Sequence, residues 1–110
     1  MTKPRSFSRY AEDAVKLLGQ QIKLERKRRK WSEAMMAERT GVSRTTLQKI
    51  EAGEMTCAIG LVFEAAALLG ICLFESDKVP LKVRIDHTQE TLALLPKRIK
   101  QSKKVIDDDF

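Results

Sequence analysis

The chemically active side chains of this 110-residue chain are mostly cations, and they gather in its first half. Residues 1–53 hold 13 Lys and Arg against 6 Asp and Glu, whereas residues 54–110 hold 8 against 9. The densest run is KLERKRRK, at residues 23–30. A one-sided positive field is expected of a surface that meets a polyanion, because each neutralised phosphate releases a condensed counterion. On charge alone, the alternative is a solvated basic helix that aids solubility.

Side chains that could support catalysis or metal binding are present, but they are not grouped for it. His87 has no Ser or Cys partner at a suggestive spacing, and there is no glycine-rich phosphate loop. Cys57 and Cys72 stand among small and apolar neighbours without a CxxC motif, so we expect reduced, partly buried thiols and no metal site. We predict no enzyme and no cofactor. Solvated or structural roles are expected for the carboxylates Glu33, Glu38 and Glu51.

The sequence gives little support for membrane insertion or membrane-surface binding. No stretch approaches the roughly 18 apolar residues of a span, and the first 15 residues lack the apolar run of a signal peptide. Binding at a membrane surface through the basic run is disfavoured, because that helix keeps no large apolar face once Leu18 and Ile22 are buried. We therefore expect a cytoplasmic protein without a membrane partner.

The elements that must position the cations are helices. With 43% apolar residues the chain has room for one modest core, and its many Ala, Leu, Glu, Lys and Arg favour an all-α fold. A first helix is predicted from Tyr10 to about Lys30. Its inward stripe holds Ala14, Val15, Leu17, Leu18 and Ile22.

Two short helices follow, one on each side of a single glycine. Ser32 is a good N-cap for EAMMAERT, which Gly41 ends, and Ser43 caps RTTLQKIEA, which Gly53 stops. Each must pack on the other and on the first helix, because an isolated helix of two turns does not persist in water. We expect the core to take Met35, Met36, Ala37, Leu47 and Ile50.

Two further helices are predicted in the second half. One runs from about Ala58 to Leu69 and stops at Gly70, with inward residues Ile59, Val62, Phe63, Ala66 and Leu69. Spacings of 4, 3, 4 and 3 favour another helix, from about Pro80 to Pro96, through Leu81, Ile85, Thr88, Leu92 and Leu95. A half-buried strand over residues 79–86 competes with it, because apolar and charged residues alternate there.

The segment MMAERTGVSRTTLQKIEAGE, Met35 to Glu54, has the spacing of a helix-turn-helix. Counting from Glu33, Ala37 is fifth and Gly41 ninth, and the apolar Leu47 and Ile50 are fifteenth and eighteenth. From Leu18 to about Gly70 the chain resembles the phage-repressor family of lambda repressor, Cro and Xre-like proteins. The resemblance implies a compact, five-helix lambda-repressor-like domain that binds DNA.

The resemblance also implies which residues meet DNA. Base edges would be reached by Arg44, Thr45 and Lys49, with Gln48 a weaker candidate, and phosphates by Ser43 and Thr46. Further phosphate contacts are expected from the end of the first helix, at Lys27, Arg28, Arg29 and Lys30. Arg26 and Glu51 match a buried ion pair of the family. The family often has a phosphate-binding glutamine where this chain has Glu33, so this carboxylate either turns away or weakens the phosphate contact there.

The resulting division of the chain has four parts. Residues 1–9 are a flexible arm, 10–76 the helix-turn-helix domain, 77–95 a dimerisation or packing helix and 96–110 a flexible tail. Family members usually dimerise on a palindromic operator, with half-sites about one helical turn apart. The apolar seam from Leu81 to Leu95 is the expected dimer surface, and packing of this helix back onto the one before it is the alternative.

The flanks narrow the resemblance further. PRSFSRYAEDAVKLLGQQIKLERK and LALLPKRI with KKVIDDDF resemble the small Xre-type proteins encoded beside Hip-type kinase toxins. This resemblance implies a bacterial, nucleoid-associated antitoxin that binds a HipA-type kinase toxin and represses the shared operon. The tail would order on the toxin through Phe110 and the acidic Asp107, Asp108 and Asp109. The alternatives are a solubilising tail and a stand-alone regulator without a toxin.

Overall fold

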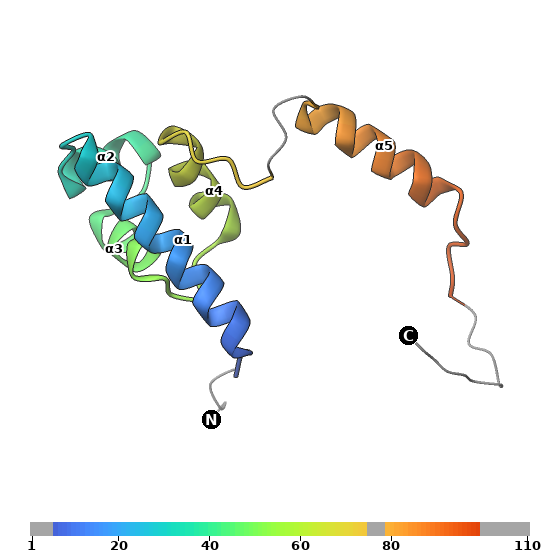
Figure 1. Ribbon diagram of the computed structural model, residues 1–110, viewed down its shortest axis with the longest axis horizontal. Helices are drawn as coiled ribbons and strands as arrows, with labels where there is room; N and C mark the ends of the chain where they lie inside the picture. The colour runs from blue at the N-terminus through green and yellow to red at the C-terminus, as the bar shows by residue number, and fades with distance from the viewer. Residues whose placement is uncertain (1–5, 75–78, 100–110) are drawn as a thin grey trace. The chain divides into compact units, whose positions relative to one another are not determined.

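A computed structural model describes residues 6–74 and 79–99, and its described elements are all α-helices, as predicted (Figure 1). The chain divides into two compact units, Met1–Leu73 and Phe74–Phe110. The helices are α1 (Arg9–Arg28), α2 (Glu33–Thr40), α3 (Arg44–Ala52), α4 (Ile59–Leu68) and α5 (Leu81–Ala93). None of the described helices is both long enough and apolar enough to cross a membrane.

Serine caps begin the first three helices. The hydroxyl oxygens of Ser8, Ser32 and Ser43 each accept a hydrogen bond from the backbone N–H three residues later, at 3.1, 3.1 and 3.0 Å. Gly41 and Gly53 end α2 and α3 with φ angles of 82° and 77°, in the left-handed region that glycine adopts without steric cost. The predicted bounds of the two short helices are therefore confirmed.

The core of the first unit draws on four helices. Its buried apolar residues are Ile22, Met36, Ala37, Leu47, Ile50, Ala65, Ala66 and Leu69. In α1 the predicted stripe was too wide: Ile22 is buried and Val15 and Leu18 are half-buried, but Ala14 and Leu17 are exposed. Met35 is likewise exposed, because it lies one position away from the buried side of α2.

Two further predictions of burial are wrong. Ile59 is 73% exposed because it opens α4, whose buried side begins only with the second turn at Val62. Cys72 is exposed in the segment after α4, whereas Cys57 is partly buried as expected. Burial raises the pKa of the Cys57 thiol. Neither cysteine forms a disulfide in the described part of the chain.

The second unit contains one described helix. Residues 81–93 are α-helical, so the helix interpretation is confirmed and the strand interpretation of residues 79–86 is wrong. Pro80 occupies the N-cap with φ −60°, close to the value that its ring imposes. No residue of α5 is buried, and its apolar residues are exposed.

Two glycines allow α1 and α3 to touch backbone to backbone. A β-carbon built on Gly19 would lie 2.5 Å from the carbonyl oxygen of Ile50 and 2.8 Å from that of Glu51. A β-carbon on Gly53 would lie 2.6 Å from the Cα of Lys16. All three distances are far below van der Waals contact, and the atoms met are backbone atoms that cannot turn aside, so the crossing requires glycine at both positions.

We predict that Gly19→Ala destabilises the first unit by about 1–3 kcal/mol, the usual cost of overpacking. Gly60→Ala is the matched control, because Gly60 is also helical and a β-carbon there has no neighbour within 4 Å among the described residues. The control should be neutral or gain up to about 1 kcal/mol from helix propensity. Urea unfolding of both variants measures the difference, and equal midpoints would contradict the close crossing.

Candidate nucleic-acid interface

The α2–α3 pair presents one side of α3 to solvent and the other to the core. Leu47 and Ile50 are buried. Four polar residues are exposed, as two adjacent pairs separated by one helical turn: Arg44, Thr45, Gln48 and Lys49. Their positions follow from the helical repeat, because residues i, i+1, i+4 and i+5 share a face. The residues predicted to reach base edges thus lie together on one exposed surface, which we call the α3 face.

The two predicted phosphate contacts at the start of α3 bind each other. Ser43 Oγ accepts from the backbone N–H of Thr46 and donates to Thr46 Oγ1, both at 3.0 Å. Ser43 is exposed and Thr46 half-buried. The pair therefore holds the first turn of α3 in place at the edge of the α3 face.

Glu33 turns toward α3. Its Oε1 accepts a hydrogen bond from Arg44 Nη2 at 3.1 Å and another from Gln48 Nε2 at 2.9 Å. The side-chain hydrogen bond from Gln48 and then that from Arg44 hold the pKa of Glu33 below its usual value, so the carboxylate is ionised at neutral pH. One oxygen of α2 thus joins two residues of the α3 face.

Arg26 and Glu51 form the buried ion pair that the resemblance implied. Arg26 Nε donates to Glu51 Oε2 at 2.7 Å and Arg26 Nη2 donates to Glu51 Oε1 at 3.0 Å, with both residues about 5% exposed. A third bond runs from Arg26 Nη1 to the carbonyl oxygen of Trp31, at 2.9 Å. The hydrogen bond to Glu51 raises the pKa of Arg26 above its usual value, so its guanidinium stays charged.

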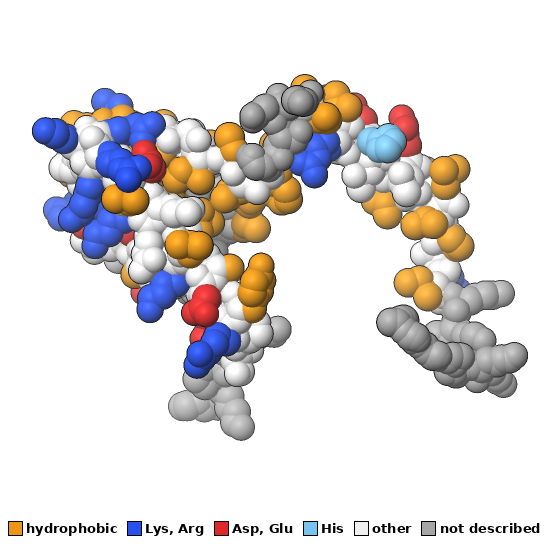
Figure 2. Space-filling view, viewed as in Figure 1, with side chains coloured by type: hydrophobic (Ala, Val, Ile, Leu, Met, Phe, Trp, Pro, Cys, Tyr) orange, Lys and Arg blue, Asp and Glu red, His pale blue; other side chains and the backbone are white. Residues whose placement is uncertain are grey.

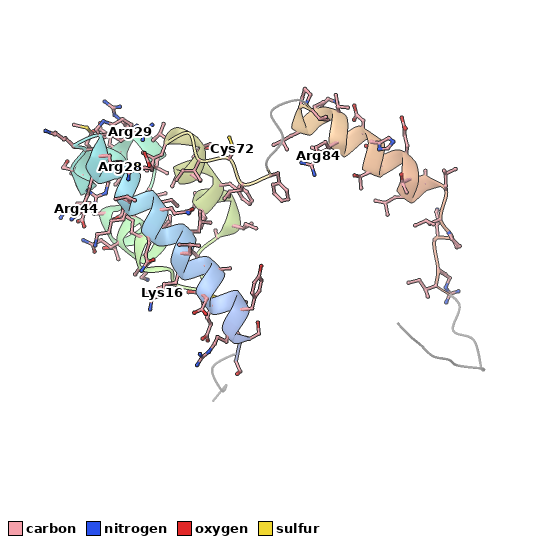
Figure 3. All side chains as sticks on the ribbon, in the orientation of Figure 1. Lys16, Arg28, Arg29, Arg44, Cys72 and Arg84 are labelled. Atoms are coloured by element: carbon pink, nitrogen blue, oxygen red, sulfur yellow. The ribbon has the colours of Figure 1, made fainter. Side chains whose placement is uncertain are left out.

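The basic run at the end of α1 is only partly available to a ligand. Arg28 and Arg29 both donate to Glu25, at 2.8 and 3.2 Å, and Arg29 also donates to the carbonyl oxygen of Leu69 at 3.0 Å. Lys27 and Lys30 are exposed and form no ion pair within the described ranges. Lys and Arg side chains nevertheless gather where α1 ends and α2 lies (Figure 2). In Figure 3, Arg28, Arg29 and Arg44 lie toward the same end of the unit.

Comparison with known families supports a helix-turn-helix interpretation of this arrangement. Residues 22–73, just under half of the chain, match the family model described as helix-turn-helix. This segment is thus similar to helix-turn-helix domains of the Xre and lambda-repressor type, in agreement with the resemblance read from the sequence. The family is one of DNA-binding transcriptional regulators. A search of curated proteins found no match.

The two helices of the helix-turn-helix motif correspond to α2 and α3. In DNA-bound members of such families the second helix of the pair enters the major groove and the first lies across the backbone. In this chain α2 is the first helix of the pair and α3 the second, and the α3 face is the exposed side of that second helix. Ser43 and Thr46 stand at its N-terminal end, where backbone N–H groups also favour phosphate.

Several contacts of the helix-turn-helix domain were not predicted. The Glu25 bridges could have been found, because Glu25 precedes Arg28 by three residues and Arg29 by four. The Arg39 guanidinium lies over the Trp31 ring, 4.3 Å from its centroid. Trp31 precedes α2 and Arg39 lies in its last turn, so the sequence spacing does not indicate this contact. The link from Glu33 to Arg44 and Gln48 also spans two helices.

The predicted partner-binding residues of the tail cannot be placed. Asp107, Asp108, Asp109 and Phe110 lie outside the described residues, as does the start of the predicted N-terminal arm. Over residues 6–74 and 79–99, no three His, Cys, Asp or Glu side chains are grouped as metal ligands would be.

Proposed function

We propose that this protein is a sequence-specific transcriptional repressor that binds a palindromic operator as a homodimer. The α3 face carries the proposal, because it places Arg44, Thr45, Gln48 and Lys49 together on the exposed side of a groove-binding helix. Arg and Lys recognise guanine through O6 and N7, Gln recognises adenine, and the threonine methyl group contacts the thymine methyl group. The face therefore has the chemistry to distinguish base pairs.

Phosphate contacts would come from around this face. Ser43 and Thr46 offer hydroxyl groups at the N-terminus of α3, and Lys27 and Lys30 offer charges that are not engaged in ion pairs within the described chain. Arg28 and Arg29 would contribute less charge, because Glu25 already binds both. These contacts position the protein on DNA without selecting a sequence.

Two features support homodimerisation: the small number of base pairs that one recognition helix can contact, and the exposed apolar residues of α5. One groove-binding helix reads too few base pairs for high specificity, and a two-fold dimer doubles the site. A mainly apolar groove along α5 is lined by Phe74, Leu81, Arg84, Ile85, Thr88, Gln89 and Leu92. In an antiparallel pair of such helices Leu81 would face Leu92 of the second copy and Ile85 would face Thr88, with no like charges opposed.

We predict that Arg44→Ala and Lys49→Ala each lower the preference for the DNA upstream of the protein's own gene over random DNA. Each lost base contact costs about 1–3 kcal/mol of discrimination, whereas most non-specific binding remains. Fluorescence anisotropy with both duplexes across a salt series measures the two affinities.

Lys16→Ala is the charge-matched control for this experiment. Lys16 is exposed on α1, away from Arg44 (Figure 3), so its loss should lower both affinities by the same small factor. Equal binding of own and random DNA by the wild type, or unchanged preference in both α3 variants, would exclude sequence reading by the α3 face.

We predict that Ile85→Glu converts the dimer to a monomer, because two carboxylates would enter the apolar seam of the paired α5 helices. His87→Glu is the matched control, since His87 is exposed on α5 and does not line the groove. Sedimentation equilibrium of the two variants measures the oligomeric state. A wild-type monomer, as packing of α5 on its own chain would give, contradicts the proposal.

Within this function we propose the role of an antitoxin that binds a HipA-type kinase toxin and represses the shared operon. The likeness of both flanks to antitoxins of that type supports it, and the tail offers Phe110 beside three aspartates. The test is co-purification with the product of the neighbouring gene in low salt, with a chain truncated before Asp107 as control. Capture that depends on the tail is expected. No complex with the full chain would leave the runner-up, a stand-alone regulator.

A further inference from the structure

Glu33 is chemically out of place on a surface that approaches phosphates. A carboxylate repels the DNA backbone, yet this one opens α2, the helix that lies across that backbone in the proposed complex. It is held there by the positive N-terminal end of α2 and by the donors Arg44 and Gln48. Glu33 therefore remains charged and directed at α3 when DNA approaches.

The two hydrogen bonds restrict how Arg44 and Gln48 can meet a base. An ionised carboxylate only accepts hydrogen bonds, so Gln48 must turn its amide nitrogen toward Glu33. Arg44 uses Nη2 for Glu33, which leaves donors on Nη1 and Nε for a ligand. Both side chains are exposed and long, and without Glu33 each would sample several rotamers.

The Glu33 carboxylate also affects whether Arg44 binds a phosphate or a base edge. An unpaired arginine at the start of the groove-binding helix can turn to the nearest phosphate, which binds any sequence equally. Paired with Glu33, Arg44 gains less from a phosphate and keeps its hydrogen-bonding geometry for a base edge. Overall affinity for DNA is lowered as a result, and discrimination between DNA sequences is raised.

The geometry points to Glu33 as a specificity-determining residue of the α3 face: it positions Arg44 and Gln48 for base edges and suppresses phosphate binding by Arg44. This inference rests on the proposed DNA-reading function and deepens it. Glu33 acts through the two residues that it holds, so it is a positioning residue and contacts no base itself.

The test compares wild type with Glu33→Gln and Glu33→Ala. Duplexes with a randomised central segment are selected by wild type, and the affinity of each variant is then measured for the best selected duplex and for a random-sequence duplex across a KCl series. In both variants the ratio of the two affinities should fall at least about fivefold, the worth of a weak bidentate base contact. Affinity for the random duplex should rise, and the slope of log affinity against log salt should steepen by about 0.9, the signature of one added phosphate contact.

Glu38→Gln is the matched control, because it removes one negative charge from an exposed position on the same helix. It should shift the affinities for both duplexes by one factor and leave their ratio unchanged. In an Arg44→Ala/Gln48→Ala background, Glu33→Gln should no longer change the ratio, which a purely structural role of Glu33 would not predict. Circular dichroism and thermal melting establish that each variant is folded.

The outcomes separate the inference from the function beneath it. If wild type selects a sequence and folded Glu33 variants keep its affinity ratio and base preferences, the role of Glu33 is overturned and the repressor stands. If wild type selects no sequence, the proposed function fails and this inference fails with it. A fall in the ratio that persists in the Arg44→Ala/Gln48→Ala background would also overturn it, because Glu33 would then act by another route.

Discussion

The buried ion pair between Arg26 and Glu51 sets the position of the α3 face. It joins the last turns of α1 and α3 by two hydrogen bonds, and a third bond from Arg26 holds the carbonyl of Trp31 just before α2 begins. Burying two charges costs desolvation energy that their attraction only offsets when the hydrogen bonds are well made. The main effect of the pair is therefore to fix how the helices are placed, more than to add net stability. All three bonds form in only one relative arrangement of α1, the start of α2 and the end of α3.

Carboxylates on this unit reshape the positive field that the composition implies. Glu25 offsets one of the two positive charges of Arg28 and Arg29, and Glu33 offsets that of Arg44. The charge left for phosphates is then centred on Lys27 and Lys30, beside a reading surface whose arginine is already paired. Exposed ion pairs of this kind add about 0–1 kcal/mol each to stability, so their larger effect is on where a polyanion is attracted.

The parts of the structure that sequence could predict are those set by local chemistry. Ser32, Gly41, Ser43 and Gly53 mark the ends of α2 and α3 because caps and left-handed turns depend on residues a few positions apart. Burial at helix edges was predicted less well: Leu17 and Ile59 fit the apolar periodicity but lie beyond the neighbouring helices. Gly19 and the Glu33 contacts could not be predicted, because each depends on how closely two helices approach. The residues proposed to read DNA do share one exposed face, although their roles came from the family resemblance.

In the proposed homodimer, the exposed apolar side of α5 would couple dimerisation to DNA recognition. A helix of 13 residues is marginal in water on its own, and no residue of α5 is buried. In the proposed homodimer, association would stabilise this helix and would also deliver the second α3 face. Two half-sites bound by one linked dimer gain the effective concentration of an intramolecular contact, so operator affinity exceeds that of either half by far more than any single base contact supplies. Folding of α5, dimerisation and recognition of a palindrome would then be one coupled equilibrium, driven by the same few apolar side chains.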